Sequence, residues 1–244
     1  MNPAEFARLA AAEERMWWFR GMRRILFDLL DPLARERNFR AVLEAGCGTG
    51  ANACALAARY GWRITSADLS PEGLRYAHRA GLPRLVQADI RALPFPDDSF
   101  DLLVSLDVLV HFAPGEEQTP LAEFARVLAP GGILVLRCAA LRILRSRHSE
   151  FVQERQRFTR GGLERSLRQN GFRVLRATYA NMFLLPVAFL KFRLWEPLAG
   201  ARPQSGVVTP APCLNRALEW PLRLEAALLR RGVKLPLGPS VIVL

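Results

Sequence analysis

Short apolar runs alternate with amphipathic stretches through the middle of this 244-residue chain. The short runs end at glycine or at a carboxylate, which is typical of buried strands, and the stretches between them favour helices. The expected strands cover residues 41–44, 63–67, 85–88, 100–105, 133–137, 172–179 and 240–244. The expected helices cover residues 52–60, a segment beginning at 70–72, and residues 119–128 and 159–170. Strands that alternate with helices predict an α/β protein with a doubly wound, mostly parallel, seven-stranded sheet.

The two ends of the chain do not follow this alternation. Residues 13–30 favour a helix, and Asp31-Pro32 is expected to break or restart it. A stretch rich in Pro, Leu and Arg separates the last two expected strands and favours a helical insertion over the substrate side. We therefore divide the chain into a helical N-terminal cap (1–40), a core (41–180), an insertion (181–238) and a last strand (239–244).

Composition limits the classes of partner. The formal net charge is +11, and arginine is concentrated between Arg137 and Arg176. A basic surface attracts nucleic acid, anionic lipid or an acidic substrate. Aromatic and basic residues do not alternate as they do in single-strand binders, so nucleic acid is not the expected partner.

Cysteine usage indicates a reducing compartment. Cys47, Cys54, Cys138 and Cys213 are scattered and form no Cys-x-x-Cys pair. This spacing argues against a disulfide framework and against a structural zinc site, and we expect no metal.

The sequence also gives an expectation about location. The first fifteen residues carry early acids and no apolar centre, unlike a signal peptide, and no apolar run reaches the ~20 residues of a membrane span. We therefore expect a cytoplasmic protein. The stretch 182–195, interrupted by Pro186, either roofs an apolar substrate pocket or lies on a membrane surface with Lys191 and Arg193 at the headgroups.

A glycine loop carries the first chemical signal. Residues 46–50 read Gly-Cys-Gly-Thr-Gly and stand between the first expected strand and a helix. Glycine lets the backbone turn sharply, and the helix N-terminus offers free N–H groups to a ligand. Because Ala51 follows, the loop also satisfies a relaxed dinucleotide pattern, and Asp68 ends the next strand where an acid binds ribose hydroxyls. Taken alone, the loop predicts either NAD or S-adenosylmethionine.

Four features around the loop separate these cofactors. Glu44 precedes the first glycine by two residues, and Asp89-Ile90 follows the third strand. Residues 93–101 read Leu-Pro-Phe-Pro-Asp-Asp-Ser-Phe-Asp, and residues 126–132 read Arg-Val-Leu-Ala-Pro-Gly-Gly. In this order they resemble the class I S-adenosylmethionine-dependent methyltransferases over about residues 40–137. The resemblance implies S-adenosylmethionine as cofactor and S-adenosylhomocysteine as product, and disfavours an NAD-dependent oxidoreductase.

The resemblance extends to a subgroup with a Trp-Trp-Phe segment near its N-terminus, here residues 17–19. Later stretches of that subgroup match residues 146–150, 178–186 and 235–240. Three places depart from the subgroup. Glu154 replaces a histidine, Gln156-Arg157 replaces a pair of arginines, and residues 107–111 read Asp-Val-Leu-Val-His where the subgroup has Asp-Val-Leu-Glu-His. These changes leave the substrate open.

The resemblance implies a set of cofactor contacts. Asp68 would accept hydrogen bonds from ribose hydroxyls, Leu69 would pack on adenine, and Asp89 with Ile90 would bind the adenine edge. The full set is Glu44, Gly46, Cys47, Gly48, Gly50, Asp68, Leu69, Asp89, Ile90 and Leu106.

The acceptor side has several candidate residues. His111 follows the fourth strand and, with an ordinary pKa of about 6.5, is a candidate base; the alternative is that it orients its loop or caps a helix. His148 is a second candidate base or substrate contact. Trp17, Trp18, Phe19 and Tyr179 are the candidate lid or substrate residues, and a buried helix face is the alternative for the Trp-Trp-Phe cluster. One of Arg20, Arg23 and Arg24 would meet the cofactor carboxylate.

The expected activity is methyl transfer to O, N or C of a small, apolar metabolite or natural-product intermediate. The basic surface keeps a nucleic-acid or protein methyltransferase as one alternative, and a non-catalytic S-adenosylmethionine-binding partner subunit is another. We expect a monomer or a homodimer.

Overall fold

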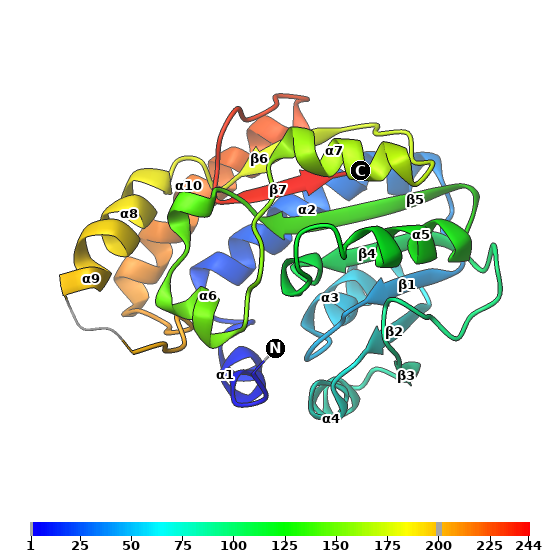
Figure 1. Ribbon diagram of the computed structural model, residues 1–244, viewed down its shortest axis with the longest axis horizontal. Helices are drawn as coiled ribbons and strands as arrows, with labels where there is room; N and C mark the ends of the chain where they lie inside the picture. Colours follow the sequence, from blue (N-terminus) through cyan, green and yellow to red (C-terminus); the bar gives the residue numbers. More distant parts are fainter. Residues whose placement is uncertain (1, 199–201) are drawn as a thin grey trace.

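Seven strands form one sheet in the computed structural model, which describes residues 2–198 and 202–244 (Figure 1). The strands are β1 (Val42–Ala45), β2 (Ile64–Asp68), β3 (Leu85–Gln87), β4 (Phe100–Leu106), β5 (Leu128–Ala139), β6 (Ala177–Ala180) and β7 (Ser240–Val243). Their order is β3-β2-β1-β4-β5-β7-β6, and all pairs are parallel except the two that β7 makes with β5 and β6. The predicted fold class, a doubly wound and mostly parallel seven-stranded sheet, is confirmed.

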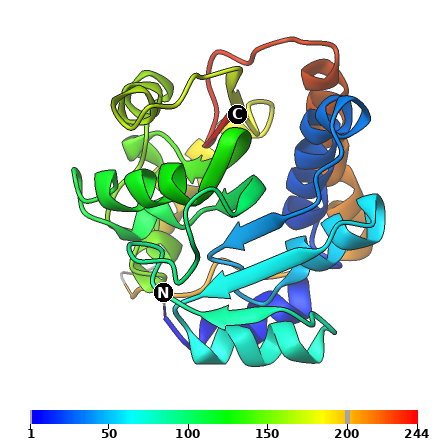
Figure 2. The same ribbon diagram turned by 90° about the vertical axis from the view of Figure 1, so that its right-hand side faces the viewer.

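Helices flank this sheet on both sides. They are α1 (Glu5–Ala12), α2 (Trp17–Glu36), α3 (Ala51–Tyr60), α4 (Pro71–Arg79), α5 (Gln118–Val127), α6 (Arg147–Phe151), α7 (Arg160–Gln169), α8 (Leu185–Phe189), α9 (Glu196–Leu198) and α10 (Pro212–Arg230). Short 3-10 turns η1 (Leu109–His111) and η2 (Arg142–Leu144) follow β4 and β5, and a π-helical segment, η3 (Leu190–Trp195), joins α8 to α9. Figure 2 shows α2 and α10 on one side of the sheet and α5 and α7 on the other.

Both faces of the central strands are covered, which explains their unbroken apolar sequence. Leu43, Leu102, Leu103 and Leu136 are fully buried. α4 begins as its sequence predicts, because the Ser70 side chain accepts a hydrogen bond from the Gly73 N–H and Pro71 occupies the first turn. No helix in the described residues has the length and apolarity needed to cross a bilayer.

The helix expected over residues 13–30 begins and ends later in the structure, as α2 at Trp17–Glu36. A separate helix, α1, precedes it, and residues 13–16 lie between the two. α2 also continues through Pro32 to Glu36. Pro32 stands one turn before the end of α2 and removes one backbone hydrogen bond, and Asp31 beside it is held by Arg59 and Tyr60 of α3.

Two strand boundaries also differ from the prediction. β5 begins at Leu128 rather than at residue 133, because Leu128 pairs with Phe100 across an irregularity in the ladder. β6 is restricted to Ala177–Ala180, although residues 172–179 were expected, because only these four residues pair with β7. The division into cap, core and insertion stays a prediction.

The parallel strands place their carboxyl ends along one edge of the sheet. Ala45, Asp68, Leu106 and Ala139 end β1, β2, β4 and β5. Helix α1 lies at this edge, beside α4 and near α6 (Figure 1). Ligands of open parallel sheets bind at this edge, so the site is sought there.

Candidate cofactor and acceptor site

The glycine loop between β1 and α3 has the backbone that its sequence predicts. Gly46, Gly48 and Gly50 have φ angles of 84°, 55° and 81°. A Cβ at position 46 would lie 2.2 Å from Cγ2 of Val108, so glycine is required for space as well as for conformation. The N–H groups of Gly46 and Cys47 both donate to the Ala67 carbonyl, which ties the loop to β2.

Asp68 fixes the loop from the end of β2. One carboxylate oxygen accepts from the Gly48 N–H at 2.7 Å, and the other accepts from the Ser70 N–H at 2.8 Å. Asp68 therefore shapes the loop in addition to any contact with a ligand. The neighbouring Leu69 side chain is 63% exposed, an apolar surface beside the loop.

Asp89, which was predicted to bind the adenine edge of the cofactor, already has a partner. Asp89 accepts hydrogen bonds from the Arg91 side chain, the shortest at 2.5 Å, and these bonds hold the pKa of the Asp89 carboxyl below its ordinary value. Ile90 beside it is buried. An adenine amino group would have to share or displace Arg91 at this carboxylate.

Glu44 is the most unusual group at the edge. It is only 2% exposed, and its Oε2 has no hydrogen-bond partner. Burial, reinforced by the nearby Glu13, raises the pKa of the Glu44 carboxyl to about 8. A buried carboxyl without a partner is costly, and a cation beside it would offset that cost.

Glu13 is a site residue that sequence reasoning missed. It comes from the break between α1 and α2, and it accepts a hydrogen bond from the Thr49 hydroxyl of the glycine loop. Burial raises the pKa of its carboxyl. No sequence motif marks this contact, because it joins residues 36 positions apart through the packing of α1.

Helix α1, helix α6 and residues 202–210 together form what we call the roof of the site. The Phe6 ring of α1 lies against the loop, because a Cβ at Gly73 would be 2.8 Å from Phe6 Cε1 and 2.9 Å from the Gly48 carbonyl oxygen. Glu5 is buried and accepts from the Ser205 hydroxyl at 2.8 Å, while its other oxygen has no partner. The roof thus joins the N-terminal residues to the insertion directly above the glycine loop.

The Trp-Trp-Phe segment reaches the same edge from the other side. The Arg137 guanidinium lies 5.1 Å from the centre of the Trp18 ring and pairs with Asp107 at 2.7 Å. Asp107 follows β4 with a φ of 60°, a left-handed conformation that this ion pair helps to hold. The structure therefore places Trp18 at the ends of β4 and β5, with Phe19 packed edge-on against it.

Trp17 has a different environment. Its backbone N–H donates to the Asn215 side chain at 2.8 Å, and Asn215 donates in turn to the Arg15 carbonyl. Asn215 thereby fixes the start of α2 from α10. The two tryptophans lie on one helix turn but contact different residues.

The two candidate histidines differ in which nitrogen is free. Nδ1 of His111 lies 3.4 Å from the carbonyl oxygen of Gln153, which can only accept, so the proton sits on Nδ1 and Nε2 keeps its lone pair. Burial lowers the pKa of His111, which keeps the ring neutral at pH 7. Gln153 has a φ of 61°, another left-handed residue at the site.

His148 shows the reverse arrangement. Its Nδ1 accepts a hydrogen bond from the Gly206 N–H at 3.0 Å, so the lone pair of Nδ1 is used and Nε2 carries the proton. Burial lowers the pKa of His148 to about 4, and the charges of Lys191 and Arg157 act in the same direction. The structure brings His148 into the roof, beside Glu5.

Several predicted residues are not brought to the edge as free groups. Tyr179 is buried in β6 at the far side of the sheet, and its hydroxyl accepts from the Arg160 N–H at the start of α7. The three arginines of α2 that were candidates for the cofactor carboxylate already have partners: Arg20 pairs with Glu219, Arg23 with Glu14 and Arg24 with Asp28. Burial raises the pKa of the Cys47 thiol, which is an unreactive loop residue at neutral pH.

The departures from the subgroup pattern have a structural use. Glu154 and Arg157 form a buried pair at 2.5 Å, and Arg157 also donates to the Ala140 carbonyl and the Ser149 hydroxyl. This network fastens the segment after α6 to the end of β5. It supports the roof without facing the glycine loop.

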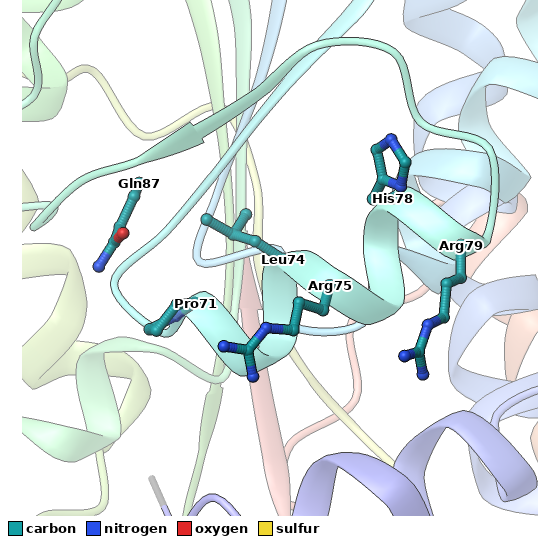
Figure 3. Close-up of a pocket in the computed structure, with 6 residues that line it drawn as sticks. All are labelled: Pro71, Leu74, Arg75, His78, Arg79 and Gln87. Atoms are coloured by element: carbon teal, nitrogen blue, oxygen red, sulfur yellow. The ribbon is translucent and has the colours of Figure 1, made fainter.

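A separate surface hollow lies between α4 and β3 (Figure 3). Its lining residues are Pro71, Leu74, Arg75, His78, Arg79 and Gln87. In Figure 3, His78 and the two arginines leave opposite sides of α4. None of the predicted site residues lines this hollow.

The fold and the edge together define an α/β protein whose glycine loop, acid-ended β2 and buried acid suit a cationic nucleoside cofactor. A family profile described as a methyltransferase domain matches residues 43–136. The O-methyltransferase rstn1 of Aspergillus nomiae is 30% identical over 169 residues, which are 64% of this chain and 73% of that protein. The chain belongs to the class I S-adenosylmethionine-dependent methyltransferases.

Other comparisons agree with this assignment. The O-methyltransferase cnsE of Penicillium expansum is 32% identical over 169 residues, 61% of this chain and 60% of that protein. For cnsE and four other curated relatives, the chain spans between 30% and 60% of their length. A chain of the solved complex between the Haloferax volcanii Trm112 methyltransferase activator and a methyltransferase has a TM-score of 0.60 and 19% identity, covering 98% of this chain and 96% of that one. At this identity the structural match supports the fold alone.

Proposed function

We propose that this protein transfers a methyl group from S-adenosylmethionine to an oxygen of a small, apolar acceptor, with His111 as the base. The observation that carries the proposal is the buried Glu44 carboxyl, whose Oε2 lacks a partner beside the glycine loop. Two relatives named as O-methyltransferases support oxygen as the methylated atom.

The residues at the edge fit a cationic cofactor. Glu44, Glu13 and Asp68 place three carboxyl groups around the loop. A bound cation would favour the ionised form of Glu44 and Glu13, whose pKa burial raises, and this suits the positive amino group and sulfonium of S-adenosylmethionine. In the proposal, Gly46 and Gly48 let the loop backbone approach the ligand, Asp68 accepts from the ribose hydroxyls and Leu69 packs on the adenine; the fixed loop geometry supports this. When bound, S-adenosylmethionine supplies an electrophilic methyl group.

His111 has the properties of a base for a hydroxyl acceptor. It is neutral at pH 7, and its Nε2 is free to accept a proton because Gln153 holds the proton on Nδ1. A hydroxyl that loses its proton as it attacks is a stronger nucleophile, and a positioned base contributes roughly 10²–10⁴-fold to such a step. In His148, the Nδ1 lone pair accepts from the Gly206 N–H and Nε2 carries the proton, so neither ring nitrogen is free to take a proton. Its role in the proposal is to fix the roof.

The roof favours a small acceptor over a polymer. Phe6 of α1 lies against the loop, and the neighbouring Glu5 is bonded to Ser205, so that α1 covers this edge. A covered site excludes water from the reacting groups, which favours methyl transfer over hydrolysis. The aromatic pair Trp18 and Phe19 gives this edge an apolar wall.

Calorimetry with S-adenosylhomocysteine tests the cofactor assignment. The unmodified protein should bind, and Asp68→Ala should weaken binding by about 100-fold, because it releases the Gly48 N–H and removes the ribose acceptor. Glu164→Ala on α7, distant from the loop, is the control and should bind normally. Failure of the unmodified protein to bind would overturn the proposal.

The acceptor class is tested by transfer of a labelled methyl group. Incubation with S-[methyl-³H]adenosylmethionine and a panel of apolar phenols and alcohols should give an organic-extractable labelled ether. Incorporation only into RNA or protein added to the same assay would replace the small acceptor with a polymer.

A further inference from the structure

The helical run from Leu185 to Leu198, formed by α8, η3 and α9, is apolar yet uncovered. None of its residues is buried. Leu194 is 54% exposed, Trp195 68% and Leu198 85%. Figure 1 shows this run at the left extremity of the molecule, far from the β2–β3 edge. We call it the outer helix.

The outer helix is nevertheless fixed to the body at both ends. Before it, Glu225 of α10 accepts hydrogen bonds from the N–H groups of Asn181 and Phe183, at 2.6 and 2.7 Å. Near its end, Glu196 accepts from the Arg147 N–H of α6 at 3.1 Å, and the Arg147 side chain donates to the Glu196 carbonyl. Specific hydrogen bonds at both ends therefore hold an apolar helix in place with many of its side chains exposed.

The distribution of apolar side chains indicates which kind of partner the outer helix fits. Val187, Leu190, Leu194 and Leu198 repeat at three- and four-residue spacing and form one exposed stripe. Phe189 and Trp195 are also exposed and fall outside that stripe. A protein groove covers one stripe of a helix, whereas the surface of a bilayer accepts apolar side chains across a broad face.

The charges of the outer helix favour an anionic surface. Lys191 and Arg193 are exposed, and the single acid of the run, Glu196, is bound to Arg147. The whole chain carries a formal charge of +11. Cations beside exposed leucine and tryptophan are the arrangement that binds anionic headgroups while the apolar side chains enter the interface.

We propose that the outer helix docks this protein on an anionic lipid surface. Because Glu196 binds Arg147 and the adjacent His148 belongs to the roof, docking places the roof against the bilayer. Entry of a membrane-dissolved acceptor through the roof follows from this placement and rests on the proposed function. The docking itself does not depend on catalysis.

Vesicle co-sedimentation of the full chain tests the docking. The protein should pellet with vesicles of 30% phosphatidylglycerol in phosphatidylcholine, pellet less with pure phosphatidylcholine, and dissociate as salt rises. Leu194→Glu should reduce the fraction bound by about tenfold or more, since it places a charge within the apolar stripe. Leu175→Glu is the matched control, and this variant should bind vesicles normally. Leu175 is 46% exposed and lies just before the start of β6, whereas the outer helix follows the end of that strand.

Each other outcome overturns the docking proposal. Absence of binding to phosphatidylglycerol vesicles excludes the lipid surface, and equal loss by both variants removes the outer helix as its cause. A dimer in light scattering that Leu194→Glu dissociates, without vesicle binding, assigns the helix to a second copy of this chain. Calorimetry with S-adenosylhomocysteine on the same preparations separates the two proposals, because loss of docking leaves cofactor binding intact.

Discussion

The cofactor edge and the roof are built in different ways. At the edge, the Asp68 carboxylate accepts hydrogen bonds from the backbone N–H groups of Gly48 and Ser70, which ties the glycine loop to the end of β2. In the roof, Glu5 meets Ser205 across 200 positions of sequence, and Glu5 keeps one oxygen without a partner. The matched methyltransferase domain, residues 43–136, contains the edge and none of the roof.

The difference separates what is general in this fold from what is particular to this chain. A glycine loop works only with a fixed backbone, so its sequence is constrained locally. A roof needs only to close over an acceptor, and many combinations of side chains achieve that. We therefore expect the edge to determine cofactor binding and the roof to determine the acceptor.

The largest effect on activity should come from replacing His111. His111→Gln should lower kcat by about 10²–10³-fold, because it removes the free Nε2, while the affinity for S-adenosylhomocysteine stays unchanged. Steady-state kinetics and calorimetry measure the two quantities. His148→Gln, which loses a roof contact but no free base, should cost less than about tenfold in kcat. Equal losses of kcat in the two variants would contradict the different roles assigned to His111 and His148 from their hydrogen bonds.

The second effect concerns pH and the Glu44 carboxyl. Its folded pKa of about 8 lies above the ordinary value of 4.5, so the stability it contributes is complete below pH 4.5 and is lost as pH rises through 8. The ligand-free protein should therefore lose several degrees of Tm between pH 6 and pH 8.5. S-adenosylhomocysteine should bind more tightly over the same range, by about tenfold, because its amino group pairs with the carboxylate.

Glu44→Gln provides the control for this pH dependence. The amide does not titrate, so both the fall in Tm and the rise in affinity should flatten in the variant. Thermal scans and calorimetry at pH 6, 7 and 8.5 measure both. A pH dependence that persists in Glu44→Gln would assign it to another group, with Glu13 the nearest candidate.

The edge could be predicted from sequence because its signals are local. The turn at Gly46–Gly50, the cap at Ser70 and the acid at the end of β2 each follow from a few adjacent residues, and the structure shows all three. The fold class followed from the alternation of strands and helices. The order of β7 before β6 was not predictable in the same way, because it depends on long-range antiparallel pairing.

Contacts between segments far apart in the sequence could not be predicted, for a physical reason that individual residues show. Glu13 bonds to Thr49 and Asn215 bonds to Trp17, but neither pair has a spacing or motif that marks it. Pro32 was expected to end α2, whereas packing and the contacts of Asp31 carry the helix past it. Tyr179 matched a subgroup stretch, but its hydroxyl serves the start of α7. Tertiary contacts decided all of these positions.

The smallest effect should come from loosening the roof alone. Ser205→Ala removes the hydroxyl that donates to buried Glu5, at a cost of about 1 kcal/mol, and should raise KM for the acceptor a few-fold with kcat and S-adenosylhomocysteine affinity unchanged. Ser99→Ala removes a comparable bond to the Pro96 carbonyl at the start of β4 and should leave KM unaltered. If Ser205→Ala instead weakens the cofactor, then roof and edge act as one unit, since Phe6 of the same helix rests on the glycine loop. Unchanged cofactor affinity with raised KM would show that the roof contributes to acceptor binding separately from the edge.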